Sequence, residues 1–183
     1  MARMHGSKRR RMYGVTLVEQ VMVVAILAIL VGIASPSLAS LVRRQSAQSA
    51  QMDFLEALGY ARGEAVLRRA RVVFCPTRDR LHCSEENRWE GGWLVGVDRD
   101  RNNQPDGAPL RVGDGHAKLL IQSSGARRRV FFLPDGSAAG SNLTLLFCSP
   151  GQARDSLGVV VSNSGRIRGS RPSKAQAAAC TGG

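Results

Sequence analysis

An apolar run near the start of the chain constrains the fold more than any other feature. From Val15 the sequence reads VTLVEQVMVVAILAILVGIA, and Glu19 is the only ionisable residue in it. Twenty helical residues extend about 30 Å, the thickness of a bilayer's hydrocarbon core. The run therefore predicts a membrane-spanning helix over residues 15–36. A secretory signal peptide has a shorter apolar core, although the small residues of 34–39 leave cleavage there as an alternative.

Basic residues precede this run and set the expected orientation of the chain. Lysine and arginine beside a span stay in the cytoplasm, so everything after about Val42 is expected on the far side of the inner membrane. The whole chain carries a formal charge of +12 and has a sequence pI of about 11.1. Such a balance favours polyanionic partners such as nucleic acid or anionic lipid.

The residues around the start of the run resemble a known signal. Gly14-Val-Thr-Leu-Val-Glu19, after a short basic leader, is similar to the class III signal of type IV pilins and pseudopilins. The resemblance implies that a prepilin peptidase removes residues 1–14 by cutting after Gly14. It also implies methylation of the new N-terminus, here Val15 where Phe or Met is more usual. Glu19 would then pair with the N-terminal amine of a neighbouring subunit, because an unpaired carboxylate in a membrane is costly.

Residues 37–70 are expected to continue the same helix in amphipathic form. Phe54, Leu58, Ala61 and Ala65 recur at helical spacing, and Glu56 falls on the opposite side. This face is predicted to pack on a globular domain rather than to form a groove for a partner.

Residues 71–183 show the pattern of an antiparallel sheet. Short apolar runs alternate with turn residues: RVVFC, GGWLVGVD, KLLIQ, RRVFFL, NLTLLFC and LGVVVS. Three polar segments supply turns at 103–107, 134–136 and 163–165. The predicted fold class is α+β, with a long N-terminal helix packed on an antiparallel β-sheet domain.

Four cysteines bear on the compartment of this domain. They lack the CxxC and histidine spacings of zinc sites, so disulfides fit an exported domain better. Three pairings are possible, and we favour Cys75 with Cys83, which closes a short loop, and Cys148 with Cys180, which pins the C-terminal tail to a strand. Free thiols are the alternative for a cytosolic chain.

Further motifs narrow the resemblance. Trp89-Glu-Gly-Gly-Trp93, the cysteine pair before it and Phe132-Leu-Pro-Asp-Gly136 resemble the type II secretion protein H and FimT/FimU minor pilin family. This family implies a periplasmic pilin-like domain over residues 71–183. The two tryptophans are expected to be core residues rather than platforms for stacked bases.

Catalytic and metal sites find little support in the sequence. His82 and His116 lack a nucleophile signature around them, so no enzyme activity and no cofactor are expected. The acidic residues of 98–106 hint at a calcium loop, but Pro109 stands where an EF-hand needs glutamate. A hairpin with polar turn residues is the better interpretation, and no metal is expected.

The C-terminal stretch SGRIRGSR holds the strongest candidate binding residues. If residues 163–165 form a turn, Arg166 and Arg168 share one face of a returning strand. An edge strand protected by charge is the plain interpretation. However, Gly165-Arg-Ile-Arg168 resembles the Gly-Arg-x-Arg element with which FimT-type minor pilins bind DNA. We extend that role to Arg171 and Lys174 from charge and proximity alone.

The expected function is therefore that of a minor pilin that binds DNA for natural transformation. The alternative is a structural pseudopilin of type II secretion, or a minor pilin that primes pilus assembly without binding DNA. Expected partners are other pilins, the prepilin peptidase, the inner membrane and DNA without sequence preference. The expected location is the bacterial inner membrane with the C-terminal domain in the periplasm.

Overall fold

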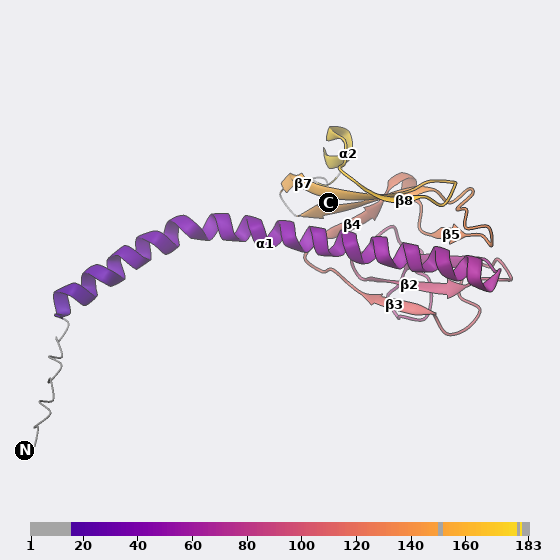
Figure 1. The fold of residues 1–183 in the computed structure, drawn as a ribbon, viewed down its shortest axis with the longest axis horizontal. Coiled ribbons are helices and arrows are strands. Elements are labelled where there is room, and N and C mark those ends of the chain that lie inside the picture. Colours follow the sequence, from indigo (N-terminus) through magenta and orange to yellow (C-terminus); the bar gives the residue numbers. More distant parts are fainter. Residues whose placement is uncertain (1–15, 150–151, 179, 181–183) are drawn as a thin grey trace, which may run out of the picture. The chain divides into compact units, whose positions relative to one another are not determined.

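The computed structural model describes residues 16–149, 152–178 and 180 (Figure 1). The chain divides into two compact units, Met1–Leu41 and Val42–Gly183. One helix, α1 (Leu17–Arg68), contributes residues to both units. Within the described parts of the chain, no helix combines the length and the apolar character that crossing a membrane requires.

Both ends of α1 are closed by local hydrogen bonds. At its start the backbone N–H of Glu19 donates to Oγ1 of Thr16 at 3.3 Å, so that threonine caps the helix. At its end the N–H of Arg69 donates to the carbonyl of Val66, and the N–H of Ala70 to that of Ala65. This pair of bonds is a Schellman motif, and Arg69 has the positive φ of 48° that the motif demands.

The predicted α+β fold is confirmed, and the antiparallel strands of the second unit form two four-stranded sheets. The first sheet has the order β3 (Arg111–Asp114), β2 (Gly92–Val97), β1 (Val72–Pro76) and β5 (Val130–Phe132). The second has the order β4 (Leu120–Ser123), β6 (Leu143–Ser149), β7 (Gln152–Val161) and β8 (Ile167–Ser170). A short 3₁₀ segment, η1 (Ser124–Ala126), follows β4, and a short helix, α2 (Lys174–Ala178), follows β8.

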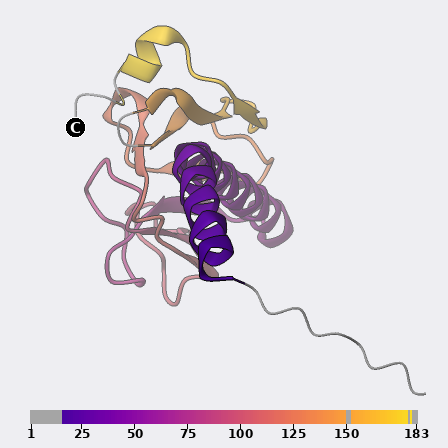
Figure 2. The ribbon, with the colours of Figure 1, turned by 90° about the vertical axis from the view of Figure 1, so that its left-hand side faces the viewer.

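The second half of α1 lies between the two sheets and supplies the centre of the core (Figures 1 and 2). The predicted apolar face is confirmed, since Phe54, Leu58, Ala61 and Ala65 are all fully buried. Trp89 and Trp93 are also buried, which confirms them as core residues. Every buried hydrophobic residue of the described chain falls between Ala47 and Cys180, so the second unit contains its own core.

The six apolar runs all became strands, and the returning strand after residue 165 is present as β8. The sequence did not predict β3, which reads RVGD and has no buried residue. It pairs with β2 at the edge of the first sheet, where backbone hydrogen bonds replace apolar burial as the reason for strand formation.

Candidate functional site

The Gly-Arg-x-Arg segment begins in a three-residue hairpin loop between β7 and β8. The N–H of Gly165 donates to the carbonyl of Ser162 at 2.9 Å, and the N–H of Ser162 donates to the carbonyl of Arg166 at 3.0 Å. Gly165 has a φ of 75°, as the residue that completes a type I turn with a bulge requires. A Cβ added to Gly165 would lie 1.9 Å from the carbonyl oxygen of Gly136.

Replacing Gly165 by alanine should therefore distort this hairpin. The new Cβ meets the backbone of the neighbouring 134–136 turn and also has to accept a left-handed conformation, which together should cost about 1–3 kcal/mol. Chemical denaturation of the variant measures this loss. Ser164→Ala, one residue earlier and exposed, is the matched control and should unfold like the parent chain. An unchanged midpoint for Gly165→Ala would show that the two turns are not in contact.

Arg168 of strand β8 lies on the face opposite the core. Ile167 packs against the main core, and a Cβ on Gly169 would contact Gln51 and Leu55 of α1. Because side chains alternate along a strand, Arg168 points to the other face. Arg166 immediately precedes the strand, and both arginines are exposed. β8 is the edge strand of its sheet and pairs only with β7.

The side chains of Arg166 and Arg168 are free to bind a ligand. Among the residues that the structure describes, neither guanidinium has a hydrogen bond or ion pair, since the bonds at Arg166 involve only its backbone. Arg171 follows β8 directly and Lys174 opens α2, and both are exposed. These four basic residues thus follow one another from just before β8 to the segment after it.

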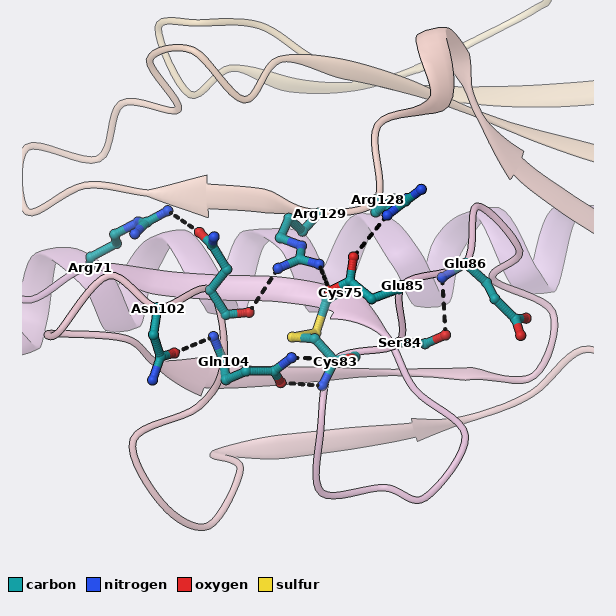
Figure 3. A network of polar contacts seen from close by, with 11 residues as sticks. Arg71, Cys75, Cys83, Ser84, Glu85, Glu86, Asn102, Gln104, Arg128 and Arg129 are labelled. Carbon is teal, nitrogen blue, oxygen red and sulfur yellow. Dashed lines mark hydrogen bonds and ion pairs between the residues drawn. A yellow bond between two sulfur atoms is a disulfide. The ribbon is translucent and has the colours of Figure 1, made fainter.

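The three consecutive arginines at 127–129 are engaged differently. Arg128 and Arg129 both bind the carboxylate of Glu85, the first through Nη1 at 2.9 Å (Figure 3). Hydrogen bonds from Arg129 and Arg128 lower the pKa of Glu85 below its usual value. Arg127 donates to the carbonyl of Gly140 at 2.7 Å. These contacts give the side chains of the 127–129 run partners within the domain, unlike those of Arg166 and Arg168.

A groove runs between α1 and the start of β8. It has a volume of about 820 Å³. Its lining residues are Leu55, Gly59, Arg62, Gly63, Val66, Leu67, Ser164, Arg166 and Ile167. Arg62 donates from Nε to the carbonyl of Gly136 at 3.0 Å, so it fixes the 134–136 turn against the helix. Arg166 is therefore the unpaired cation of this groove within the described chain.

The four cysteines form two disulfides. Cys75 bonds to Cys83 and Cys148 bonds to Cys180, the same pairing that the sequence analysis favours. The first closes the loop after β1, and Gln104 holds that loop by accepting from the N–H of Cys83 at 2.7 Å (Figure 3). The second joins the C-terminal segment to β6 and so encloses β7, β8 and the four basic candidates in one covalent loop.

The candidate assembly residues lie in the first unit. Gly14 and Val15, where we expect cleavage and methylation, fall outside the described residues. Glu19 is exposed in the first turn of α1.

The acidic residues of the 98–106 loop do come together. Carboxylate oxygens of Asp98, Asp100 and Asp106 lie within 4.8 Å of one another. Asp98 is fully buried, and Nη1 of Arg71 lies 3.1 Å from its Oδ2. Burial raises the pKa of Asp98, and the charge of Arg71 opposes that rise. This pair could not be predicted from the sequence, because Arg71 looks like the start of a strand and no motif links it to residue 98.

The chain is similar to known proteins in sequence and in fold. Residues 50–165 match the family model described as type II transport protein GspH. None of the curated proteins matches the chain. The crystal structure of the type IV minor pilin FimU of Pseudomonas aeruginosa is similar, with a TM-score of 0.58 and 26% identity over 70% of this chain and 90% of that one.

A more distant structure shares the fold. The minor pseudopilin EpsH from the type 2 secretion system of Vibrio cholerae has a TM-score of 0.50 and 14% identity, over 70% of this chain and 99% of that one. The family match covers more than half of the chain, from residue 50 in α1 through the first sheet and strands β4, β6 and β7 of the second, and it ends at Gly165 before β8. The chain is therefore a member of the GspH family of pilin-like proteins.

Proposed function

We propose that this chain is a minor pilin that binds DNA along β8 as part of DNA uptake. The observation that carries the proposal is the pair of exposed guanidinium groups of Arg166, just before β8, and Arg168, within this edge strand, neither of which has a partner in the described chain. Guanidinium groups suit phosphate oxygens because they offer several donors in a fixed plane. The net charge of +12 supports a polyanionic ligand.

The N-terminal unit has a role in assembly under this proposal. Cleavage after Gly14 would expose Val15 as the N-terminus, to be methylated by the peptidase. The apolar run that follows would hold the chain in the inner membrane before assembly, with the β-rich domain in the periplasm. Glu19 would pair with the terminal amine of an adjacent subunit in the filament. The two disulfides support an oxidising compartment for residues 71–183.

The proposal is tested by replacing both arginines with glutamine in the unit from Val42, which has its own core. Two phosphate contacts should be lost, so the slope of log K against log[salt] should flatten by about 1.8 on duplex DNA. Affinity near 0.1 M salt should fall by roughly 60-fold if each contact acts through counterion release alone. Fluorescence anisotropy with labelled duplex DNA over a salt series gives both quantities.

The matched control removes the same charge elsewhere. Arg78 and Arg80 are exposed but ion-paired with Glu86 and Asp114, so Arg78→Gln with Arg80→Gln should leave the slope nearly unchanged. Equal affinity of the Arg166→Gln, Arg168→Gln variant and the parent chain would remove these arginines from DNA binding. Arg171 and Lys174 are then replaced singly. Each replacement should reduce DNA affinity by less than the replacement of Arg166 or of Arg168.

A second candidate function follows from the family match. A structural pseudopilin of type II secretion, or an assembly-priming minor pilin, has the same fold and needs no ligand on β8. Under that function the unpaired arginines protect an edge strand from pairing with other strands. Absence of DNA retention by the parent chain at low salt would favour it, whereas loss of filament assembly when Glu19 is replaced by alanine is expected under both functions.

A further inference from the structure

A second cluster of arginines surrounds a small cavity where α1 ends. The cavity has a volume of about 210 Å³. Its lining residues are Arg69, Ala70, Arg71, Arg99, Arg101, Leu133 and Pro134. Arginine is thus the majority of the lining, and it comes from the end of the helix and from the loop after β2. The candidate binding residues on β8 do not include any of these side chains.

Most of this positive charge is not neutralised within the described chain. Arg71 is paired with Asp98, but the guanidinium groups of Arg69, Arg99 and Arg101 have no hydrogen bond or ion pair in the part that the structure describes. Neighbouring carboxylates are engaged by their own loops. Asp100 accepts from Asn102, Asp106 from the N–H of Arg99 and Asp135 from the N–H of Ser137.

The charges also affect one another. Burial lowers the pKa of Arg71, Asp98 partly restores it, and the charges of Arg101 and Arg129 lower it further. Cations therefore crowd this end of the domain, and a bound anion would relieve their repulsion.

The backbone at two of these arginines is in a conformation that favours glycine. Arg69 has a φ of 48° and Arg101 a φ of 61°. Glycine adopts this region without the steric cost that a Cβ brings, and it is the usual residue at the end of a helix. Strained positions that keep a larger side chain concentrate at binding sites. Arginine at both positions therefore points to a use for the side chains.

The loop that holds Arg99 and Arg101 is fixed from several sides (Figure 3). Asn103 accepts from Nη2 of Arg71 at 3.0 Å through its side chain, and its carbonyl accepts from Nη1 of Arg129 at 3.2 Å. Gln104 donates to the carbonyl of Cys83 and accepts from the N–H of the same residue. A ligand held here would not have to order the loop first, which lowers the entropic cost of binding.

One turn connects this cavity with the β7–β8 hairpin. Leu133 and Pro134 line the cavity, while the carbonyl of Gly136 accepts from Arg62 and lies against Gly165. The N–H of Ala138 donates to the carbonyl of Asn163 at 2.9 Å, which ties the turn to the hairpin a second time. The arginine cavity and the Arg166 side of the groove therefore border the same turn from opposite ends.

We infer that Arg69, Arg99 and Arg101 form a second phosphate-binding site, which holds a further phosphodiester of the DNA bound at Arg166 and Arg168. This inference rests on the proposed DNA binding. Arg71 positions the site through Asp98 and Asn103. DNA then crosses the 133–136 turn and is held at two places, which fixes its direction on the domain as a single contact could not.

The test replaces Arg69 and Arg101 with glycine in the full-length chain in non-ionic detergent. One phosphate contact should be lost, so the salt slope should flatten by about 0.9 and affinity near 0.1 M salt should fall about 8-fold. The melting temperature should not fall, because glycine fits both backbone positions better than arginine. If the two arginines had a purely structural role, the melting temperature of the glycine variant should fall.

The chain offers a matched control in Arg80. It also has a positive φ, 65°, but it is ion-paired with Asp114 and lies outside the cavity. The melting temperature of Arg80→Gly should therefore not fall either, and its DNA affinity should equal that of the parent chain. Arg99→Gln is a second variant that leaves both strained positions untouched, and it should weaken DNA binding in the same direction as the glycine pair.

The possible results separate this inference from the proposed function. If only the Arg166→Gln, Arg168→Gln variant loses affinity, the second site is wrong and DNA binding on β8 stands. If only the cavity variants lose affinity, the arginine cavity binds DNA by itself, and both DNA binding on β8 and the two-site inference are wrong. If the parent chain does not retain DNA at low salt, both are wrong. If inorganic phosphate binds in a way that depends on Arg69 and Arg101 while DNA affinity is unchanged, the cavity takes a small anion and the DNA inference fails.

Discussion

Arg71→Leu should destabilise the domain by about 3–5 kcal/mol near neutral pH, because it leaves Asp98 buried and ionised without its cation. The side chain of Asp98 is fully buried and that of Arg71 is 15% exposed. The guanidinium also lies 3.6 Å from the ring centre of Phe131 and donates to Asn103, so several contacts are lost together. Urea denaturation of the second unit measures the loss.

The effect of Arg71→Leu should depend on pH. Burial already holds the folded pKa of Asp98 above its unfolded value of about 4, and removing Arg71 raises it further. An acid with a raised folded pKa contributes stability that is fully present below its unfolded pKa and is lost as pH rises through the folded pKa. The loss of stability caused by Arg71→Leu should therefore be smaller near pH 4 than near pH 7. Near pH 7 the folded variant must either keep Asp98 ionised without its cation or bind a proton that the unfolded chain does not bind, and either costs free energy.

Asp98→Asn provides the control for this prediction. Combined with Arg71→Leu, it removes the buried charge, so the double variant should be more stable near neutral pH than Arg71→Leu alone and should lose its extra pH dependence. A loss from Arg71→Leu that is equal at both pH values would show that packing on Phe131, rather than charge, accounts for the role of Arg71.

Phe54→Ala should cost about 3–5 kcal/mol, since it empties the centre of the core. The ring of Phe54 is fully buried and lies 5.1 Å from that of Phe147 and 5.8 Å from that of Phe74, both edge to face. Phe147 belongs to the second sheet and Phe74 to the first, so this ring joins both sheets to α1.

The measurement for Phe54→Ala is again chemical denaturation, with two comparisons on the same helix. Phe54→Leu keeps most of the volume and should lose clearly less stability. Met52→Ala, at a side chain that is 65% exposed, should change stability by no more than about 0.5 kcal/mol. If Phe54→Ala cost no more than Met52→Ala, the two sheets would not depend on the helix for their packing.

The sequence predicted those parts of the fold that depend on local periodicity. The face with Phe54 and Leu58 repeats at helical spacing, and a repeat of that kind has to be buried wherever the helix docks. Turns at 134–136 and 163–165 were also predictable, because glycine there permits the positive φ values that the structure shows. The division into two sheets was not, since it depends on which strands pair across long separations in sequence.

The same limit applies to the candidate sites. Arg166 and Arg168 could be found because they lie two residues apart in the sequence where a strand was expected to begin, and the family resemblance pointed to them. The cavity at the end of α1 brings together Arg69 with Arg99 and Arg101, which lie some thirty residues further along the chain. In the sequence, Asp98-Arg-Asp-Arg101 looks like a neutral, alternating turn. The structure shows that Asp98 is buried and that Asp100 accepts hydrogen bonds from Asn102 of its own loop. Within the described chain, the guanidinium groups of Arg99 and Arg101 remain unpaired.

Under the proposed function, the covalent loop closed by Cys148 and Cys180 would have a mechanical consequence for DNA held at the edge strand β8. A pull on β8 would act on hydrogen bonds to β7 alone, and such bonds separate one after another when a strand is peeled from a sheet. Because Cys180, beyond the end of β8, is bonded to Cys148 of β6, the segment between these two cysteines cannot be drawn out beyond the length of the closed loop. The disulfide would thus limit how far tension on bound DNA could extend the chain.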